Sequence, residues 1–131
     1  MRVLLDTHAF LWFVLGDTRL SVRARTVIED PDNQRFVSLA SAWEMAIKVS
    51  IGKLTAIASS KPFAEDLLDK LSANDMTLLP VDLLSVAQTA YLPFHHRDPF
   101  DRLIVAQSII DNLTLISVDT VFDAYGVARI W

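Results

Sequence analysis

Short apolar runs alternate with longer segments of helical periodicity along the whole chain. The first run, residues 1–5, is interrupted only by Arg2, and its length and branched side chains predict a strand buried on both faces. Equally short runs predict further strands at residues 36–38, 77–79, 113–118 and 127–130. Because helical segments separate these strands, the pattern predicts a three-layer α/β fold, in which helices cover both faces of a parallel sheet and residues 1–5 form the central strand.

The helices are predicted from apolar spacing and from residues that cap or break helices. Ser21 and Asp82 precede periodic segments as N-caps, Ser41 begins another, and Gly16 and Gly52 follow such segments as stops. The expected helices span residues 7–15, 21–30, 41–52, 62–71, 82–91, 101–111 and 121–124. No repeat or linker interrupts this succession, so we expect residues 1–131 to form a single domain.

The amino-acid composition excludes several classes of protein. The 131 residues are 52% apolar and 21% charged, which excludes a disordered or low-complexity chain. The absence of cysteine excludes disulfides, a thiolate nucleophile and a cysteine-based zinc site. The longest N-terminal apolar stretch, residues 9–15, is too short to span a bilayer and lacks the flanks of a cleaved signal. We therefore expect a soluble, cytoplasmic protein with no membrane partner.

Five acidic residues are predicted to lie near one edge of the sheet. Asp6 directly follows the first strand, and Asp119 follows the fourth. The carboxyl ends of parallel strands meet at the edge where open α/β sheets bind their ligands. Glu44 and Asp101 lie near the starts of helices that follow the same edge, and Asp98 lies in the loop just before Asp101. The pattern therefore indicates that five carboxylates converge.

Each acid also has a purely structural explanation. Aspartate is a preferred N-cap, so capping alone accounts for Asp98 and Asp101 when each is taken singly. Glu44 is harder to explain in this way, because it stands between Trp43 and Met45 in an apolar helix where an unpaired charge is costly. Asp6 is the strongest signal for function, because the end of a buried strand offers a carboxylate little water.

Convergent carboxylates need a counter-charge. Two of them about 4 Å apart repel by roughly 4 kcal/mol at an effective dielectric constant near 20. Mg²⁺ and Mn²⁺ prefer such oxygen ligands, and a bound cation makes the site attractive to phosphate although the chain carries a formal net charge of −4. The chemistry that follows is metal-assisted hydrolysis of a phosphodiester.

Basic residues and histidines near the acids add candidate roles. Arg97, Arg102, Lys48 and Lys53 could guide a nucleic-acid backbone, although solvated surface charge is the simpler explanation for each. His8, His95 and His96 do not have zinc-site spacing, and we expect them to form hydrogen bonds.

Four ordered blocks of sequence carry a resemblance to a known family. They are Leu4-Leu5-Asp6-Thr7-His8 with Leu11-Trp12, Ser41-Ala42-Trp43-Glu44-Met45-Ala46-Ile47-Lys48, His96-Arg97-Asp98-Pro99-Phe100-Asp101-Arg102-Leu103, and Ser117-Val118-Asp119. Together they resemble the PIN-domain family, and more narrowly the VapC-type toxins of bacterial and archaeal toxin–antitoxin modules. The match covers nearly the whole chain.

The resemblance implies a Mg²⁺- or Mn²⁺-dependent endoribonuclease with a five-stranded parallel sheet. It also implies a homodimer that a VapB-like antitoxin holds inactive. Carried over by position, the metal-binding acids fall on Asp6, Glu44, Asp101 and Asp119. Asp98 belongs to an Asp-Pro-Phe-Asp-Arg variant, as an extra ligand or as a support for one. Thr7 and Ser117 match hydroxyl positions near such a site.

The sequence argues against two other functions and leaves a third open. A phosphoacceptor signalling domain needs a lysine at a late strand end, but the last lysine of the chain is Lys70. A nucleotide-binding loop needs clustered glycines, and the three glycines are scattered. A non-catalytic interaction domain remains open, in which the acidic pocket receives a basic side chain from a partner. An antitoxin could silence the enzyme in the same way.

The high apolar content also predicts a homodimer. We expect hydrophobic surface, with the helices that carry Trp12 or Phe63 as candidates, to be covered by a second copy.

Overall fold

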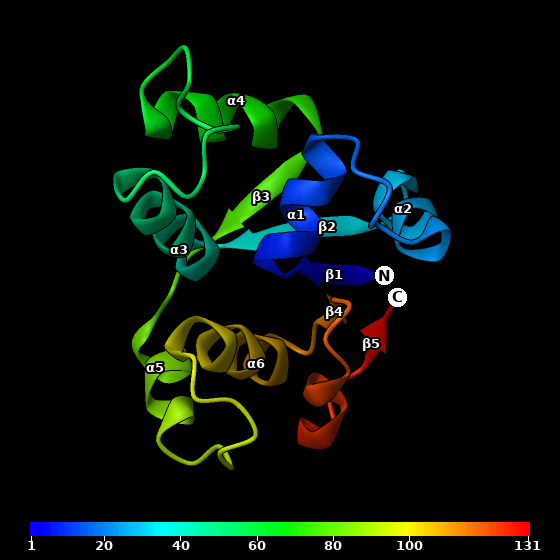
Figure 1. Cartoon of the computed structure of the whole chain (residues 1–131). Coiled ribbons are helices and arrows are strands. Elements are labelled where there is room, and N and C mark those ends of the chain that lie inside the picture. Colours follow the sequence, from blue (N-terminus) through cyan, green and yellow to red (C-terminus); the bar gives the residue numbers. More distant parts are fainter.

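The computed structural model describes residues 1–131 and contains one sheet of five parallel strands (Figure 1). The strands are β1 (Arg2–Leu5), β2 (Gln34–Ser38), β3 (Met76–Leu79), β4 (Thr114–Ile116) and β5 (Arg129–Ile130). Their order in the sheet is β3-β2-β1-β4-β5, and every neighbouring pair is parallel. The predicted parallel sheet, with the first strand at its centre, is therefore confirmed.

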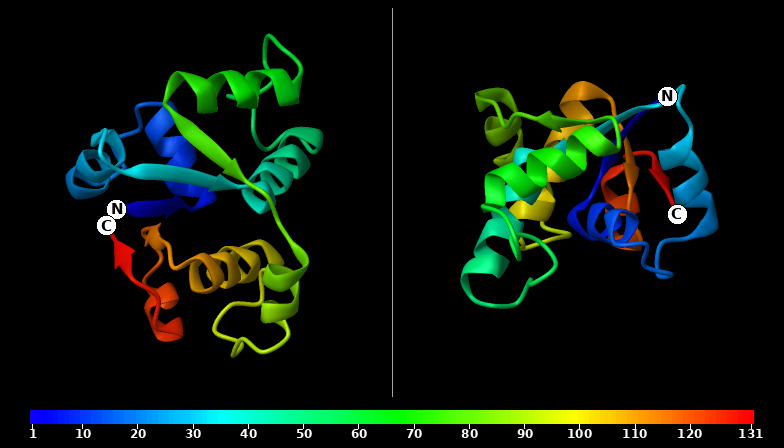
Figure 2. Two further views of the ribbon diagram at one scale, coloured as in Figure 1. Left: turned by 180° about the vertical axis from the view of Figure 1, so that it is seen from behind. Right: turned by 90° about the horizontal axis from the view of Figure 1, so that it is seen from above.

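Six α-helices and one 3₁₀-helix connect the strands. They are α1 (Thr7–Val14), α2 (Val22–Glu29), α3 (Leu39–Ser50), α4 (Phe63–Ala73), α5 (Leu83–Thr89), α6 (Pro99–Asp111) and η1 (Thr120–Tyr125). In Figure 1, α1, α3 and α4 lie above β1, and α5, α6 and η1 lie below it. Figure 2 shows the same arrangement from behind and from above.

Two apolar clusters, one on each face, hold the layers together. Alternate residues of a strand point to opposite faces, so Val3 and Leu5 join one cluster while Leu4 joins the other. The larger cluster receives side chains from α1 to α4, and the smaller one is built mainly from α6 and Phe122 of η1. The sheet is therefore covered on both faces, as its uninterrupted apolar strands predict.

Two helices begin earlier than the sequence predicts, and both starts bear on the acidic residues. α3 begins at Leu39, where the Ser38 hydroxyl accepts a hydrogen bond from the Ala40 N–H at 3.0 Å. Ser41 is instead buried inside the helix, and its hydroxyl accepts a hydrogen bond from Thr7 at 3.0 Å. α6 begins at Pro99 with Asp98 as its N-cap. A short polar residue caps each start, but neighbouring serines or aspartates compete for that position.

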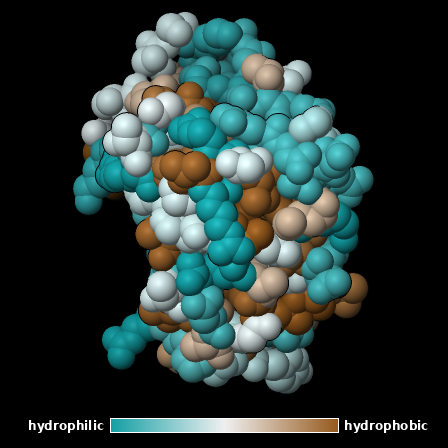
Figure 3. All heavy atoms as spheres, turned by 90° about the vertical axis from the view of Figure 1, so that its right-hand side faces the viewer, coloured by the Kyte–Doolittle hydropathy of each residue, from teal (hydrophilic) through white to brown (hydrophobic).

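Apolar residues remain exposed on α3 and α5. Trp43 is 61% exposed and Leu84 is 66% exposed, whereas Trp12 and Phe63 are half-buried against the larger cluster. The core uses the Trp12 and Phe63 side chains themselves, whereas Leu68 on the Phe63 helix, α4, is 56% exposed. On the side that carries α2 and the C-terminal strand, hydrophilic and hydrophobic residues are intermixed (Figure 3). None of the helices combines the length and the apolar character that a membrane crossing requires.

Candidate active site

A cavity of about 310 Å³ lies at the carboxyl edge of the sheet, beside the ends of β1 and β4. The chain passes from β1 to β2 on one side and returns to pair β4 on the other, so this is the point where ligands bind in open α/β sheets. All five acids singled out in the sequence line it, and they come from four separate segments. The lining residues are Asp6, Thr7, His8, Glu44, Asp98, Asp101, Val118, Asp119 and Phe122.

Asp6 is held rigidly at the floor of this cavity. Its Oδ1 accepts a hydrogen bond from the Ala9 N–H at 2.8 Å and caps α1, while its Oδ2 accepts one from the Ser117 hydroxyl. Burial raises the pKa of Asp6, although the hydrogen bonds from Ser117 and Ala9 oppose the shift. Two donors thus fix a carboxylate that has almost no access to water.

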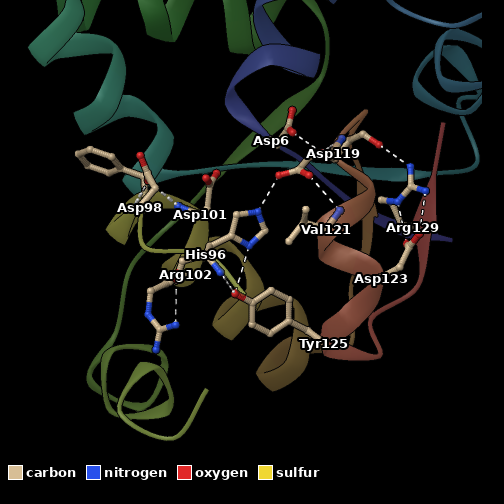
Figure 4. A network of polar contacts seen from close by, with 12 residues as sticks. Asp6, His96, Asp98, Asp101, Arg102, Asp119, Val121, Asp123, Tyr125 and Arg129 are labelled. Atoms are coloured by element: carbon tan, nitrogen blue, oxygen red, sulfur yellow. Dashed lines mark hydrogen bonds and ion pairs between the residues drawn. The ribbon is translucent and has the colours of Figure 1, made fainter. Parts of the chain in front are cut away.

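Asp119 also lines the cavity and is linked to Asp6 through Ser117. The backbone N–H of Asp119 donates to the Ser117 hydroxyl at 3.1 Å. Its Oδ1 accepts from the Val121 N–H at 2.9 Å and caps η1, and its Oδ2 lies 2.6 Å from Nε2 of His96 (Figure 4). A chain of hydrogen bonds therefore joins the ends of β1 and β4.

Asp101 and Glu44 face the cavity from two helices. Burial raises the pKa of Asp101 to about 7, with further contributions from the negative charges of Asp98, Glu44 and Asp6, against a lowering by His96. The nearest cation to Glu44 is Lys48, whose Nζ is 4.0 Å from Oε2. Negative charge thus accumulates here without a matching buried cation.

Asp98 occupies the rim. Its Oδ1 accepts hydrogen bonds from the N–H groups of Phe100 at 2.8 Å and Asp101 at 3.1 Å, which makes it the N-cap of α6. Its side chain is exposed, unlike that of Asp6. The capping explanation therefore accounts for one of its oxygens, and the other is free to act in the cavity.

Residues 3–128 match the family model of the PIN domain. The chain belongs to the PIN-domain family. A comparison with curated protein sequences found no match.

Solved structures with the same fold agree with this assignment. A chain in the VapBC2 structure from Rickettsia felis, bound to a promoter DNA fragment, superposes with a TM-score of 0.69 at 16% identity, covering 99% of this chain and 98% of that one. A chain in FitAcB from Neisseria gonorrhoeae gives 0.66 at 21% identity, with 100% and 97% covered. A chain in VapBC-5 from Mycobacterium tuberculosis gives 0.59 at 24% identity, with 98% and 97% covered. The predicted PIN fold is thereby confirmed.

The candidate basic residues of this PIN domain differ in where they lie relative to the cavity. Lys48 lies beside Glu44, whereas Lys53 is exposed beyond the end of α3. Arg97 is exposed in the loop next to Asp98. Lys48 and Arg97 therefore lie next to carboxylates of the cavity lining, although neither lines the cavity itself.

Arg102 does not have the position that sequence reasoning gave it. Its guanidinium is buried, with Nη1 donating to the carbonyls of Pro93 and His96, and Nη2 donating to those of Thr89 and Leu92. Four of its five N–H groups are thus used to organise residues 89–96. The prediction that Arg102 binds substrate is contradicted, because its hydrogen bonds are already satisfied by the backbone.

The sequence does not predict the contacts of two residues at the site of this PIN domain. For His96 it predicts only that the side chain forms a hydrogen bond, and for Tyr125 it predicts no role. Tyr125 belongs to η1, yet its hydroxyl accepts a hydrogen bond from the His96 N–H at 2.8 Å. Its spacing from the acids carries no recognisable signal, although His96 stands two residues before Asp98.

The donor set of this PIN domain fits a hard divalent cation that keeps some of its water. As the side chains lie, no three acidic or histidine groups are close enough to enclose a metal ion directly. Yet all five acidic side chains offer oxygen, and burial raises the pKa of both Asp6 and Asp101, with the charge of Asp98 adding to the shift at Asp101. Mg²⁺ typically binds through one or two carboxylates and several waters, which suits this arrangement.

Proposed function

We propose that residues 1–131 act as a single PIN domain with Mg²⁺- or Mn²⁺-dependent endoribonuclease activity, of the VapC toxin type. The observation that supports this best is the convergence of five carboxylates on one cavity at the switch point of the sheet. The similar folds in VapBC and FitAcB structures support the toxin class.

Asp6, Glu44, Asp101 and Asp119 are the residues that would hold the cation. When bound, it supplies polarisation of a phosphoryl oxygen and acidification of a water molecule. A carboxylate of this set orients the attacking water, and Asp98 supports Asp101 from the rim. Lys48 and Arg97 contact the RNA backbone as it enters, since each lies next to a carboxylate that lines the cavity.

A VapB-like antitoxin is the proposed protein partner. The description of VapBC-5, one of the structures with this fold, names it a member of the VapBC family of toxin–antitoxin systems, and VapBC2 bears the same family name. The cavity is acidic, so a basic side chain of the partner is able to enter it in place of the cation. Titrating the complex with Mn²⁺ tests this: we expect weaker Mn²⁺ binding than in the antitoxin-free protein, and equal affinity would contradict it.

A homodimer is the proposed assembly. The apolar groove between α3 and α5 offers hydrophobic surface that a second copy would cover. It is lined by Leu39, Ala40, Trp43, Val81, Val86 and Leu103.

The nuclease proposal is tested by incubating the purified, antitoxin-free protein with a mixed RNA pool in EDTA, Mg²⁺ or Mn²⁺. We expect internal cleavage only with a divalent cation. If calorimetry detects neither Mn²⁺ nor Mg²⁺ binding and no RNA is cleaved, the cavity serves instead as a non-catalytic receptor for a basic side chain. The acidic lining of the cavity supports that alternative, because it suits a basic side chain of a partner.

A further inference from the structure

A chain of three side chains lies behind the acidic cavity. Tyr125 ends η1, His96 belongs to the loop before α6, and Asp119 caps η1 (Figure 4). The His96 ring lies between the other two, with Nδ1 3.1 Å from the Tyr125 hydroxyl and Nε2 2.6 Å from Oδ2 of Asp119. The loop before α6 is thereby tied to both ends of η1.

The partners assign every donor and acceptor in this chain. The backbone N–H of His96 donates to the Tyr125 oxygen at 2.8 Å, and the Tyr125 hydroxyl can donate to Nδ1 when that nitrogen carries no hydrogen. The carboxylate of Asp119 only accepts, so Nε2 must carry a hydrogen. Tyr125 thus selects the histidine tautomer that donates to Asp119.

The ring is also confined by packing. The His96 side chain is 10% exposed and stacks on Tyr125 with ring planes 4° apart and centroids 5.6 Å apart. Its other side meets Phe122 at a centroid distance of 4.6 Å. If the His96 ring rotated out of this position, it would lose these contacts and the hydrogen bonds at both of its nitrogens.

Asp119 is consequently held by a donor on each oxygen. Val121 donates to Oδ1 and His96 to Oδ2, which leaves the carboxylate one orientation beside the cavity. A group held in its binding orientation loses less conformational entropy when it takes a cation than one that is free to rotate.

We propose that His96 and Tyr125 are positioning residues that fix the Asp119 carboxylate for a divalent cation and so set the affinity of the site. This inference rests on the proposed function for the identity of the cation. The pair acts through Asp119 and touches neither the cation nor the RNA.

Mn²⁺ binding to the antitoxin-free protein tests the pair, with calorimetry as the readout and circular dichroism to confirm folding. We expect Tyr125→Phe and His96→Leu each to weaken Mn²⁺ binding by about tenfold or more. His96→Gln should recover part of the loss, because its amide N–H can replace the Nε2 donor. Tyr91→Phe is the matched control, because Tyr91 is 83% exposed and is not one of the three hydrogen-bonded side chains. Removing its hydroxyl should leave Mn²⁺ binding unchanged.

A second readout needs no cation. Nitrogen-15 NMR of the metal-free protein should show His96 with a protonated Nε2, and Tyr125→Phe should mix in the other tautomer. A purely structural role would lower the melting temperature without altering Mn²⁺ affinity or tautomer.

The inference is overturned if folded His96→Leu and Tyr125→Phe bind Mn²⁺ as the wild type does, if the wild type binds no divalent cation, or if Nδ1 carries the hydrogen. If only the nuclease proposal fails, the wild type still binds Mn²⁺ and the substitutions still weaken that binding, but the wild type cleaves no RNA.

Discussion

Asp98 caps the helix that carries Asp101 and at the same time raises the pKa of Asp101. The Asp98 Oδ1 accepts the Asp101 N–H at 3.1 Å, which stabilises the start of α6. Its charge then adds to burial in raising the pKa of Asp101 to about 7. The same residue therefore supports the helix and helps concentrate negative charge in the cavity.

This relationship makes the stability of the metal-free protein depend on pH. Asp101 has a folded pKa of about 7 against an ordinary value of 3.8, so the folded state binds the proton more tightly. Its contribution to the unfolding free energy therefore falls as pH rises from about 4 to about 7, by no more than about 1.4 kcal/mol per pH unit. Asp101→Asn should flatten this slope in urea unfolding.

Asp111→Asn is the matched control, since Asp111 stands at the far end of the same helix. It should leave the slope unchanged. A wild-type slope identical to that of Asp101→Asn would show that Asp101 is ionised throughout this range.

Arg102 should behave as a structural residue. Arg102→Ala leaves four backbone carbonyls without their donor, and we expect it to lower the unfolding free energy by about 2–4 kcal/mol in urea titrations. Arg102→Lys should recover little, because an ammonium group cannot reach four carbonyls as the planar guanidinium does. Unchanged stability together with weaker RNA binding would instead return Arg102 to the substrate-binding set.

Sequence patterns could predict the sheet and its acids but not the contacts between loops. Asp6 and Asp119 each follow a strand. In a parallel sheet the carboxyl ends of the strands share one edge, independently of the conformation of the loops. Arg102 directly follows Asp101, yet the helix turns it away from the cavity and toward the carbonyls of the preceding loop. His96 and Asp119 are 23 residues apart, and only the path of two loops brings them into contact.

If the protein is a homodimer, one charged substitution in its interface should lower the molecular mass measured in solution. Val86→Asp places a charge in the apolar groove between α3 and α5, and we expect it to convert a dimer to a monomer in light scattering at micromolar concentration. Val22→Asp is the control, because Val22 is 84% exposed on α2, away from that surface. A monomeric wild type would rule out the dimer, and a dimeric Val86→Asp would place the interface elsewhere.

The central claim is that the acidic cavity is the seat of a cation-dependent ribonuclease. RNA cleavage by the wild type, Asp6→Asn and Asp111→Asn in Mn²⁺ tests it most directly. Asparagine keeps an oxygen that can cap α1 but removes the buried charge, so Asp6→Asn should stay folded and lose at least a hundredfold of the cleavage rate, about 2.7 kcal/mol in barrier height. Asp111→Asn should cleave as the wild type does. Cleavage by Asp6→Asn at the wild-type rate, or in EDTA, would contradict the account.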